Sequence, residues 1–142
     1  MKQNPTDDCW PKVSAWDTLN TTINGQLINN KPIARPCYQG AGYSKEICED
    51  ISSNWTVNSW LATSPVGYSY PAFDSCPAIN ATIGAGRYPQ CDLGNFPVYT
   101  VNATRSSDIA AGIKFSKDHN VRLVIKNTGH DISQRYESTH DQ

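Results

Sequence analysis

Apolar residues in the first part of the chain recur at helical spacing. Between positions 9 and 24 they return every three or four residues, at Trp10, Val13, Trp16, Leu19 and Ile23. Proline is tolerated in a first turn and glycine ends helices, so Pro11 and Gly25 fit the two ends of this pattern. The spacing predicts an amphipathic helix over residues 9–24.

A second row of apolar residues predicts a helix over residues 44–55. Ile47, Ile51 and Trp55 stand four positions apart, and Ser44 is a favourable N-cap. Trp60 extends the same face. Between the two helices, prolines limit residues 26–36 to one edge strand around Leu27 and Ile28.

Proline and glycine interrupt every period over residues 63–96, which predicts a long loop clamped by cysteines. A structureless stretch of this length is unusual inside a compact domain. The pattern therefore favours a segment that wraps over another part of a larger protein.

Regular structure is predicted again after position 96. Residues 97–102 have strand composition, and a helix follows from the polar residues before Asp108 to about His119, where Asn120 is the stop. Its inward face is predicted to hold Ile109, Gly112, Ile113 and Ser116, with Lys114 and Lys117 outward.

Residues 121–126 read as a second strand, so strand, helix and strand predict a right-handed β-α-β unit that begins a sheet. The polar turn 127–131 then lies at the carboxyl end of that strand. Sheets of this kind bind ligands there, so the chemistry is expected in this turn.

Five cysteines, Cys9, Cys37, Cys48, Cys76 and Cys91, indicate disulfides rather than a zinc or redox site, because no CxxC pair occurs. Cys37 with Cys48, and Cys76 with Cys91, would each close a short loop, although sequence alone does not fix the pairing. The odd cysteine either stays free or pairs elsewhere.

Four sequons, at Asn20, Asn54, Asn80 and Asn102, join the cysteines in favouring a secreted protein. The first residues contain no apolar signal-peptide core, and no apolar run approaches the length of a membrane span. A formal net charge of -1 argues against nucleic acid as a partner.

Several smaller motifs are assigned ordinary roles. The Gly-Ala-Gly pairs at 40–42 and 84–86 lack the third glycine and the strand-to-helix junction of a dinucleotide site. Asp7 and Asp8 suit a helix start better than a metal, His119 a helix end, and His140 a polar tail. His130 differs because Thr128 and Gly129 let the turn backbone approach a ligand closely.

Four segments in this order resemble the vanillyl-alcohol-oxidase type flavoproteins with a PCMH-type FAD-binding domain, above all the fungal berberine-bridge-enzyme-like branch: 97–104, 108–115, 121–126 and 127–131. Upstream, Asp8-Cys-Trp-Pro, Trp16, Leu19-Asn and Pro36-Cys-Tyr resemble the N-terminal extension of the fungal proteins. The resemblance implies an α+β fold. A helical, disulfide-stapled extension over residues 1–96 precedes the first β-α-β unit of an incomplete FAD-binding domain over 97–135, and an atypical tail covers 136–142.

By this resemblance, FAD is the cofactor, His130 carries an 8α-histidyl flavin linkage, and Asn127, Thr128, Gly129 and Asp131 form the pyrophosphate turn. The family has a glycine where this chain has Gln134, and its substrate-binding sheet and catalytic base lie further downstream. We therefore expect no catalytic residue and no metal site in this chain.

The leading hypothesis is an N-terminal fragment of a secreted FAD-linked oxidase, inactive alone, which in full-length form passes a hydride from a small-molecule substrate to flavin and yields hydrogen peroxide. Two alternatives stay open. One is a small, secreted, disulfide-bonded glycoprotein that binds a ligand or partner without catalysis, for which Tyr68, Tyr70 and Phe73 would supply aromatic contacts. The other is a truncated gene product.

Overall fold

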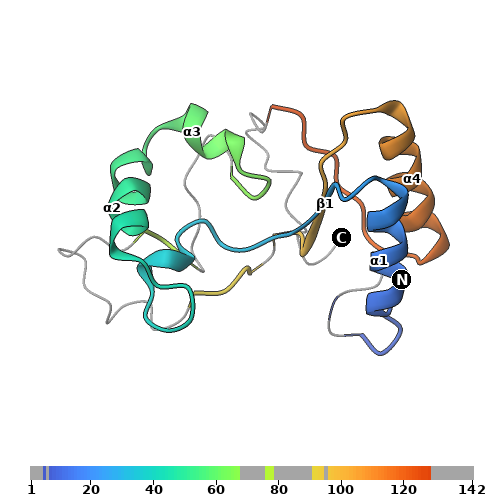
Figure 1. Cartoon of the computed structure of the whole chain (residues 1–142), viewed down its shortest axis with the longest axis horizontal. Coiled ribbons are helices and arrows are strands. Elements are labelled where there is room, and N and C mark those ends of the chain that lie inside the picture. Colours follow the sequence, from blue (N-terminus) through green and yellow to red (C-terminus); the bar gives the residue numbers. More distant parts are fainter. Residues whose placement is uncertain (1–4, 6, 68–75, 79–90, 95, 129–142) are drawn as a thin grey trace, which may run out of the picture. The chain divides into compact units, whose positions relative to one another are not determined.

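The computed structural model describes residues 5, 7–67, 76–78, 91–94 and 96–128, which fall into two compact units. The first unit combines residues 1–29 with 98–125, and the second combines 30–97 with 126–142. The elements in chain order are α1 (Val13–Thr22), β1 (Leu27–Asn29), the 3-10 helix η1 (Arg35–Cys37), α2 (Lys45–Asn54), α3 (Asn58–Thr63), β2 (Tyr99–Val101) and α4 (Ser106–Asp118) (Figure 1).

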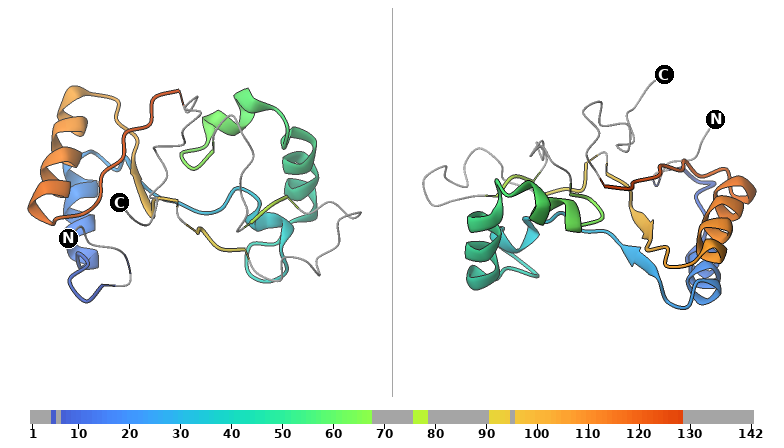
Figure 2. Two further views of the ribbon diagram at one scale, coloured as in Figure 1. Left: turned by 180° about the vertical axis from the view of Figure 1, so that it is seen from behind. Right: turned by 90° about the horizontal axis from the view of Figure 1, so that it is seen from above.

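In the first unit, α1 and α4 lie next to each other, as the two views in Figure 2 show. The centre of their contact is the Trp16 indole, which stacks on Tyr99 with ring centroids 4.3 Å apart and meets Phe115 at 4.5 Å. Leu19, Ile23 and Val121 complete the buried cluster. Aromatic rings therefore join the first helix to the strand and helix that follow much later in sequence.

Both helices of the first unit end in the same hydrogen-bond arrangement. After α1, the Gly25 amide donates to the Asn20 carbonyl at 2.8 Å, and after α4 the Val121 amide donates to Ser116 at 3.0 Å. The residue past each C-cap, Asn24 or Asn120, has a left-handed φ of 54°. These are Schellman endings, in which asparagine tolerates positive φ. The predicted stops at Gly25 and Asn120 are confirmed.

The predicted α+β class is confirmed, since the described residues combine helices with a small sheet. The predicted β-α-β unit is not formed. β2 pairs antiparallel with β1, in the register Leu27↔Val101 and Asn29↔Tyr99, whereas the strand predicted over 121–126 is reduced to a single bridge at Val121. A strand needs a partner backbone, and residues 122–126 pair with no strand of the described part of the chain.

The inward face of α4 matches the prediction in part. Ser116 is buried as predicted, and a Cβ at Gly112 would lie 3.5 Å from Val101 Cγ2. Asp108 is buried as well, whereas Ile109 and Ile113, predicted to face inward, are 53% and 47% exposed. Phe115 fixes the rotation of the helix because its ring packs against Trp16. Similarly, Val13 on α1 and Ile47 on α2 are exposed although their rows were predicted to be buried.

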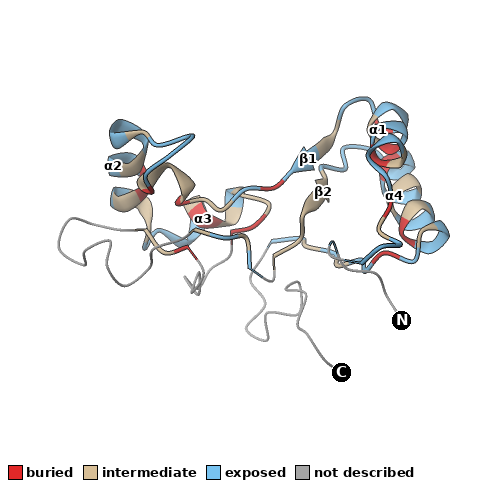
Figure 3. Cartoon of the chain, turned by 90° about the horizontal axis from the view of Figure 1, so that it is seen from below, coloured by how far each residue is buried: buried red, intermediate tan, exposed pale blue. Residues whose placement is uncertain are grey.

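The second unit is built from η1, α2 and α3, with Ala34, Tyr38, Ile51 and Cys76 as its buried cluster. The predicted N-cap of α2 is confirmed: the Ser44 hydroxyl accepts from the Ile47 amide at 3.3 Å. The buried positions of α3 and of the elements around it are red in Figure 3. In the described parts of the predicted long loop, no helix or strand follows Thr63.

The two short cysteine loops named from the sequence are disulfides, Cys37–Cys48 and Cys76–Cys91. Cys9 is free and exposed. The tyrosine hydroxyl of Tyr38 donates to the Pro77 carbonyl at 2.9 Å, which links η1 to the segment after Cys76. Covalent and polar links thus hold together a unit with few buried apolar residues.

Trp60 lies on α3, a separate short helix that the sequence pattern did not predict. Leu61 on this helix is fully buried against Ile33, Trp55 and Phe96. Directly after the helix the backbone of Gly67 comes so close to Leu61 that an added Cβ would lie 1.8 Å from the Leu61 oxygen. Only glycine fits at position 67.

The N-terminus of α4 is held by one buried carboxylate. Asp108 accepts hydrogen bonds from the backbone amides of Thr104 and Arg105 at 3.2 and 3.1 Å, and from the Arg105 guanidinium at 2.7 Å. The Arg105 contact is the main reason why the pKa of Asp108 falls from 3.8 to about 2. The ionised carboxylate therefore stabilises the start of α4.

We predict that the chain loses stability in acid through Asp108. Because its folded pKa of about 2 lies below the usual 3.8, the contribution is complete above 3.8 and disappears as the pH falls through 2. Thermal melting between pH 2 and 7 should show this loss, and Asp108→Asn should lower the melting temperature at pH 7 and flatten the acid slope. The matched variant Asp118→Asn, which removes an exposed partner of Lys114, should change far less. Equal effects of the two variants would contradict the prediction.

We predict that the Cys37–Cys48 bridge is needed for the stability of the second unit. Removing a bridge that spans 11 positions costs about 3 kcal/mol in the chain-entropy account. Urea unfolding of the Cys37→Ala, Cys48→Ala double variant should therefore begin at clearly lower urea. Cys9→Ala is the control and should unfold like the parent chain. Unfolding of the double variant at the parental urea concentration would be the opposite result.

Candidate functional site

Of the turn 127–131, which the sequence predicts as the cofactor site, the structure describes the first two residues. Asn127 and Thr128 are exposed residues in a bend that follows residues 122–126, which form no regular secondary structure. Gly129, His130 and Asp131 lie outside the described residues, as do Gln134 and His140. The geometry therefore concerns how the chain enters the turn.

The entry into the turn is fixed by Lys126. Its ammonium donates hydrogen bonds to three backbone carbonyls, those of Ala62 at 3.1 Å, Ser64 at 2.6 Å and Gly67 at 2.7 Å. An ammonium group has three donors and no acceptor, so its hydrogen-bonding capacity is used in full. Lys126 is thus tied to a segment about sixty positions earlier in sequence.

The acceptors of Lys126 lie at the carboxyl end of α3. The last carbonyls of a helix have no partner within it, and the negative end of the helix dipole favours a cation there. The Thr63 hydroxyl donates to the Trp60 carbonyl at 2.6 Å, and the Ser64 amide donates to the Leu61 carbonyl at 3.1 Å. Lys126 donates to the Ala62 carbonyl of the helix and to two carbonyls that follow the helix.

Burial lowers the pKa of Lys126 from its usual 10.5. Removal from water disfavours the charged form, whereas the three carbonyl dipoles around the ammonium favour it. The three short contacts require three N–H donors, which the protonated group alone provides. Lys126 is therefore a structural cation and not a free base.

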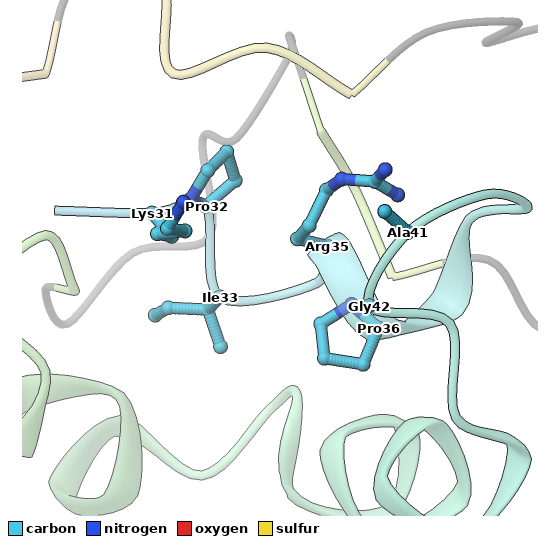
Figure 4. Close-up of a pocket in the computed structure, with 7 residues that line it drawn as sticks. All are labelled: Lys31, Pro32, Ile33, Arg35, Pro36, Ala41 and Gly42. Atoms are coloured by element: carbon cyan, nitrogen blue, oxygen red, sulfur yellow. The ribbon is translucent and has the colours of Figure 1, made fainter.

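A cavity of about 390 Å³ lies elsewhere in the second unit, between the segment before η1 and the turn after it (Figure 4). Its lining consists of Lys31, Pro32, Ile33, Arg35, Pro36, Ala41 and Gly42. The Arg35 guanidinium also donates to the Tyr38 carbonyl at 3.2 Å. The cavity is wide open to solvent, and its lining contains neither Asn127 nor Thr128.

Sequence reasoning missed Lys126 and the two cations of this cavity. The available signal for Lys126 was a charged residue that ends an apolar run directly before a polar turn. Its three partners could not be inferred, because α3 itself was not predicted. Lys31 and Arg35 stand in a proline-rich segment with no periodicity to indicate a shared cavity.

Asp7 and Asp8 do not lie at a helix start as predicted, because α1 begins at Val13 with Lys12 as its N-cap and has no acidic residue in its first turn. The turn at Gly40 and Gly42, both with positive φ, follows a 3-10 helix rather than a strand. His119 is the C-cap of α4, with its ring 4.4 Å from that of Phe115. In the described part of the chain, no helix has the combined length and apolarity that a bilayer crossing requires.

No family model matches the chain. Individual relatives do. FAD-linked oxidoreductase apf9 of Gibberella fujikuroi is 41% identical over 134 residues, which is 94% of this chain and 22% of that protein. The VAO-type flavoprotein oxidase VAO615 of Thermothelomyces thermophilus is 35% identical over 133 residues, 89% of this chain and 22% of its own length.

Two solved structures share the fold. The VAO-type flavoprotein MtVAO713 from Myceliophthora thermophila C1 matches with a TM-score of 0.87 at 36% identity, over 96% of this chain and 24% of that one. MtVAO615 from the same organism matches with a TM-score of 0.79 at 36% identity, over 92% of this chain and 24% of that one. The chain thus spans less than a quarter of the length of these proteins, and it is a homologue of the FAD-linked oxidoreductases and VAO-type flavoproteins.

Proposed function

We propose that this chain carries the flavin-anchoring turn of a secreted FAD-linked oxidase. The observation that supports this most is the match of 94% of the chain to an FAD-linked oxidoreductase at 41% identity. The candidate turn follows a lysine whose ammonium is docked on three carbonyls. The same homology disfavours a ligand-binding glycoprotein unrelated to flavin.

The proposed cofactor site consists of Asn127, Thr128, Gly129, His130 and Asp131. Backbone amides of such a turn can hold the FAD pyrophosphate, and glycine allows close approach. Asn127 and Thr128 are exposed. Their exposure is compatible with contact to a phosphate-bearing cofactor.

In this proposal His130 is the attachment point, through an 8α-histidyl bond to the flavin. The imidazole must be neutral when its nitrogen forms that bond, since a protonated ring has no free electron pair. The new C–N bond would replace one C–H bond of the 8α-methyl group and the imidazole N–H bond, and it would leave the flavin reduced by two electrons, so that oxygen would have to reoxidise it. Bound FAD would accept a hydride from a small-molecule substrate and pass electrons to oxygen, which gives hydrogen peroxide. The substrate pocket and catalytic base would come from the parts of the relatives that this chain does not span.

The proposal assigns residues 1–96 to an N-terminal extension, 97–135 to the start of a PCMH-type FAD-binding domain and 136–142 to an atypical tail. The same proposal places the chain in the berberine-bridge-enzyme-like branch. The two disulfides support an oxidising compartment, and the sequons are compatible with secretion as a glycoprotein.

We predict that His130→Ala abolishes covalent flavin. The experiment uses a chimera in which this chain replaces the matching segment of FAD-linked oxidoreductase apf9, so that the rest of an FAD protein is present. After denaturation, the parent chimera should retain flavin absorbance with the protein, and the variant should release all of it. The control His119→Ala, at the C-cap of α4, should keep the covalent flavin. Flavin that stays bound to denatured His130→Ala protein would show the assignment to be wrong.

We also predict unequal use of the sequons in a secreting host. Asn102 is exposed, whereas Asn20 and Asn54 are half-buried, and the side-chain oxygen of Asn20 accepts from the Leu27 amide at 3.0 Å. Glycopeptide mass spectrometry should find a glycan at Asn102 and little or none at Asn20. Full occupancy at Asn20 would contradict the prediction, and no glycan at any site would argue against the secretory route.

A further inference from the structure

Lys126 stands at the point where the chain returns to the second unit after α4. The preceding residue, Ile125, is 76% exposed and contributes little packing. The position of the following residue, Asn127, therefore depends strongly on the contacts of Lys126. These contacts are the three hydrogen bonds to Ala62, Ser64 and Gly67.

The backbone that binds the Lys126 ammonium, residues 62–67, is held in place by packing. Leu61 is fully buried and Val66 is 3% exposed, so the backbone between them is packed at both ends. The close approach of Gly67 to the Leu61 carbonyl leaves no room for a side chain. The Gly67 amide also donates to the Ser64 carbonyl at 3.0 Å. Two of the three acceptors are therefore themselves held in place.

The contacts extend beyond what the helix end requires. A lysine that only neutralised the dipole of α3 would contact the last carbonyls of the helix. Lys126 takes one such carbonyl, from Ala62, and two that follow the helix, from Ser64 and Gly67. Three acceptors spread over six positions define the place of the ammonium in all directions.

The same geometry excludes the simplest alternative role. A lysine next to a phosphate-binding turn would ordinarily be assigned a direct contact with the phosphate. The three donors of Lys126 are already engaged by backbone carbonyls, so none is left for a phosphate oxygen. The role left for Lys126 is to fix the position of the backbone at the start of the turn.

We propose that Lys126 is a positioning residue that holds the start of the turn 127–131 in the place needed for flavin attachment. The inference rests on the proposed function of that turn. Because bond formation between two groups depends steeply on their relative position, loss of the anchor slows attachment more than it weakens FAD binding.

Three variants in the apf9 chimera separate the possible roles. Lys126→Met removes the ammonium and keeps the apolar stem. Lys126→Arg keeps the charge but replaces the three-point contact by a planar fork. Thr63→Val removes the hydrogen bond from the same helix end to Trp60 without touching the turn. For each variant, bound FAD is measured before denaturation, and the rate of covalent incorporation into apo-protein is followed after FAD is added.

We expect covalent incorporation to slow about tenfold in Lys126→Met, while total FAD bound before denaturation stays near that of the parent. Lys126→Arg should recover only part of the rate, and Thr63→Val should match the parent. Full recovery by arginine would assign a charge effect instead. Equal slowing in Lys126→Met and Thr63→Val, or no slowing in Lys126→Met, would overturn the proposal.

A second measurement tests the anchor in the 142-residue chain itself, without flavin. Amide hydrogen exchange at Asn127 and Thr128 should be faster in Lys126→Met than in the parent, while exchange in α4 stays the same. Unchanged exchange at both amides would overturn the anchoring role. If the amides respond but the parent chimera binds no covalent flavin, the proposed function fails while the anchor stands.

Discussion

The contact on which the candidate site depends is the docking of one ammonium on three backbone carbonyls. The three donors of Lys126 meet three acceptors at and beyond the end of α3. These three carbonyls are close enough together to bind one ammonium because Leu61 is fully buried and Gly67 carries no side chain. The site thus depends on the packing of a helix of six residues, in a unit that also contains two disulfides and a second buried cluster around Ile51.

The first unit depends on a different kind of contact. Trp16 stacks on Tyr99 and meets Phe115 at a tilt, and so joins α1 to β2 and α4. Asp108 fixes the start of α4 through backbone amides and Arg105. These interactions explain how α1 can share a unit with residues that follow about eighty positions later. They also leave Ile109 and Ile113 on the outer side of α4.

Local signals in the sequence predicted local structure well. The Ser44 cap and the asparagine at position 120 marked helix ends correctly, because such residues act through hydrogen bonds or φ angles of their own neighbourhood. Pairing was harder. β2 joins β1 rather than residues 121–126, since pairing depends on which backbone is nearest in space. On α4 the prediction was right for Ser116 but wrong for Ile109 and Ile113, because Phe115 rather than the isoleucines packs on Trp16.

The turn residues Asn127 and Thr128 could be proposed from the sequence, but Lys126 could not, because its partners lie about sixty positions away, at and after an unpredicted helix.

The most direct test of the central claim is peptide mass mapping of the apf9 chimera after proteolysis. The proposed function predicts that the peptide containing His130 carries the added mass of the flavin. An unmodified His130 peptide, with the flavin on another residue or released, would contradict it.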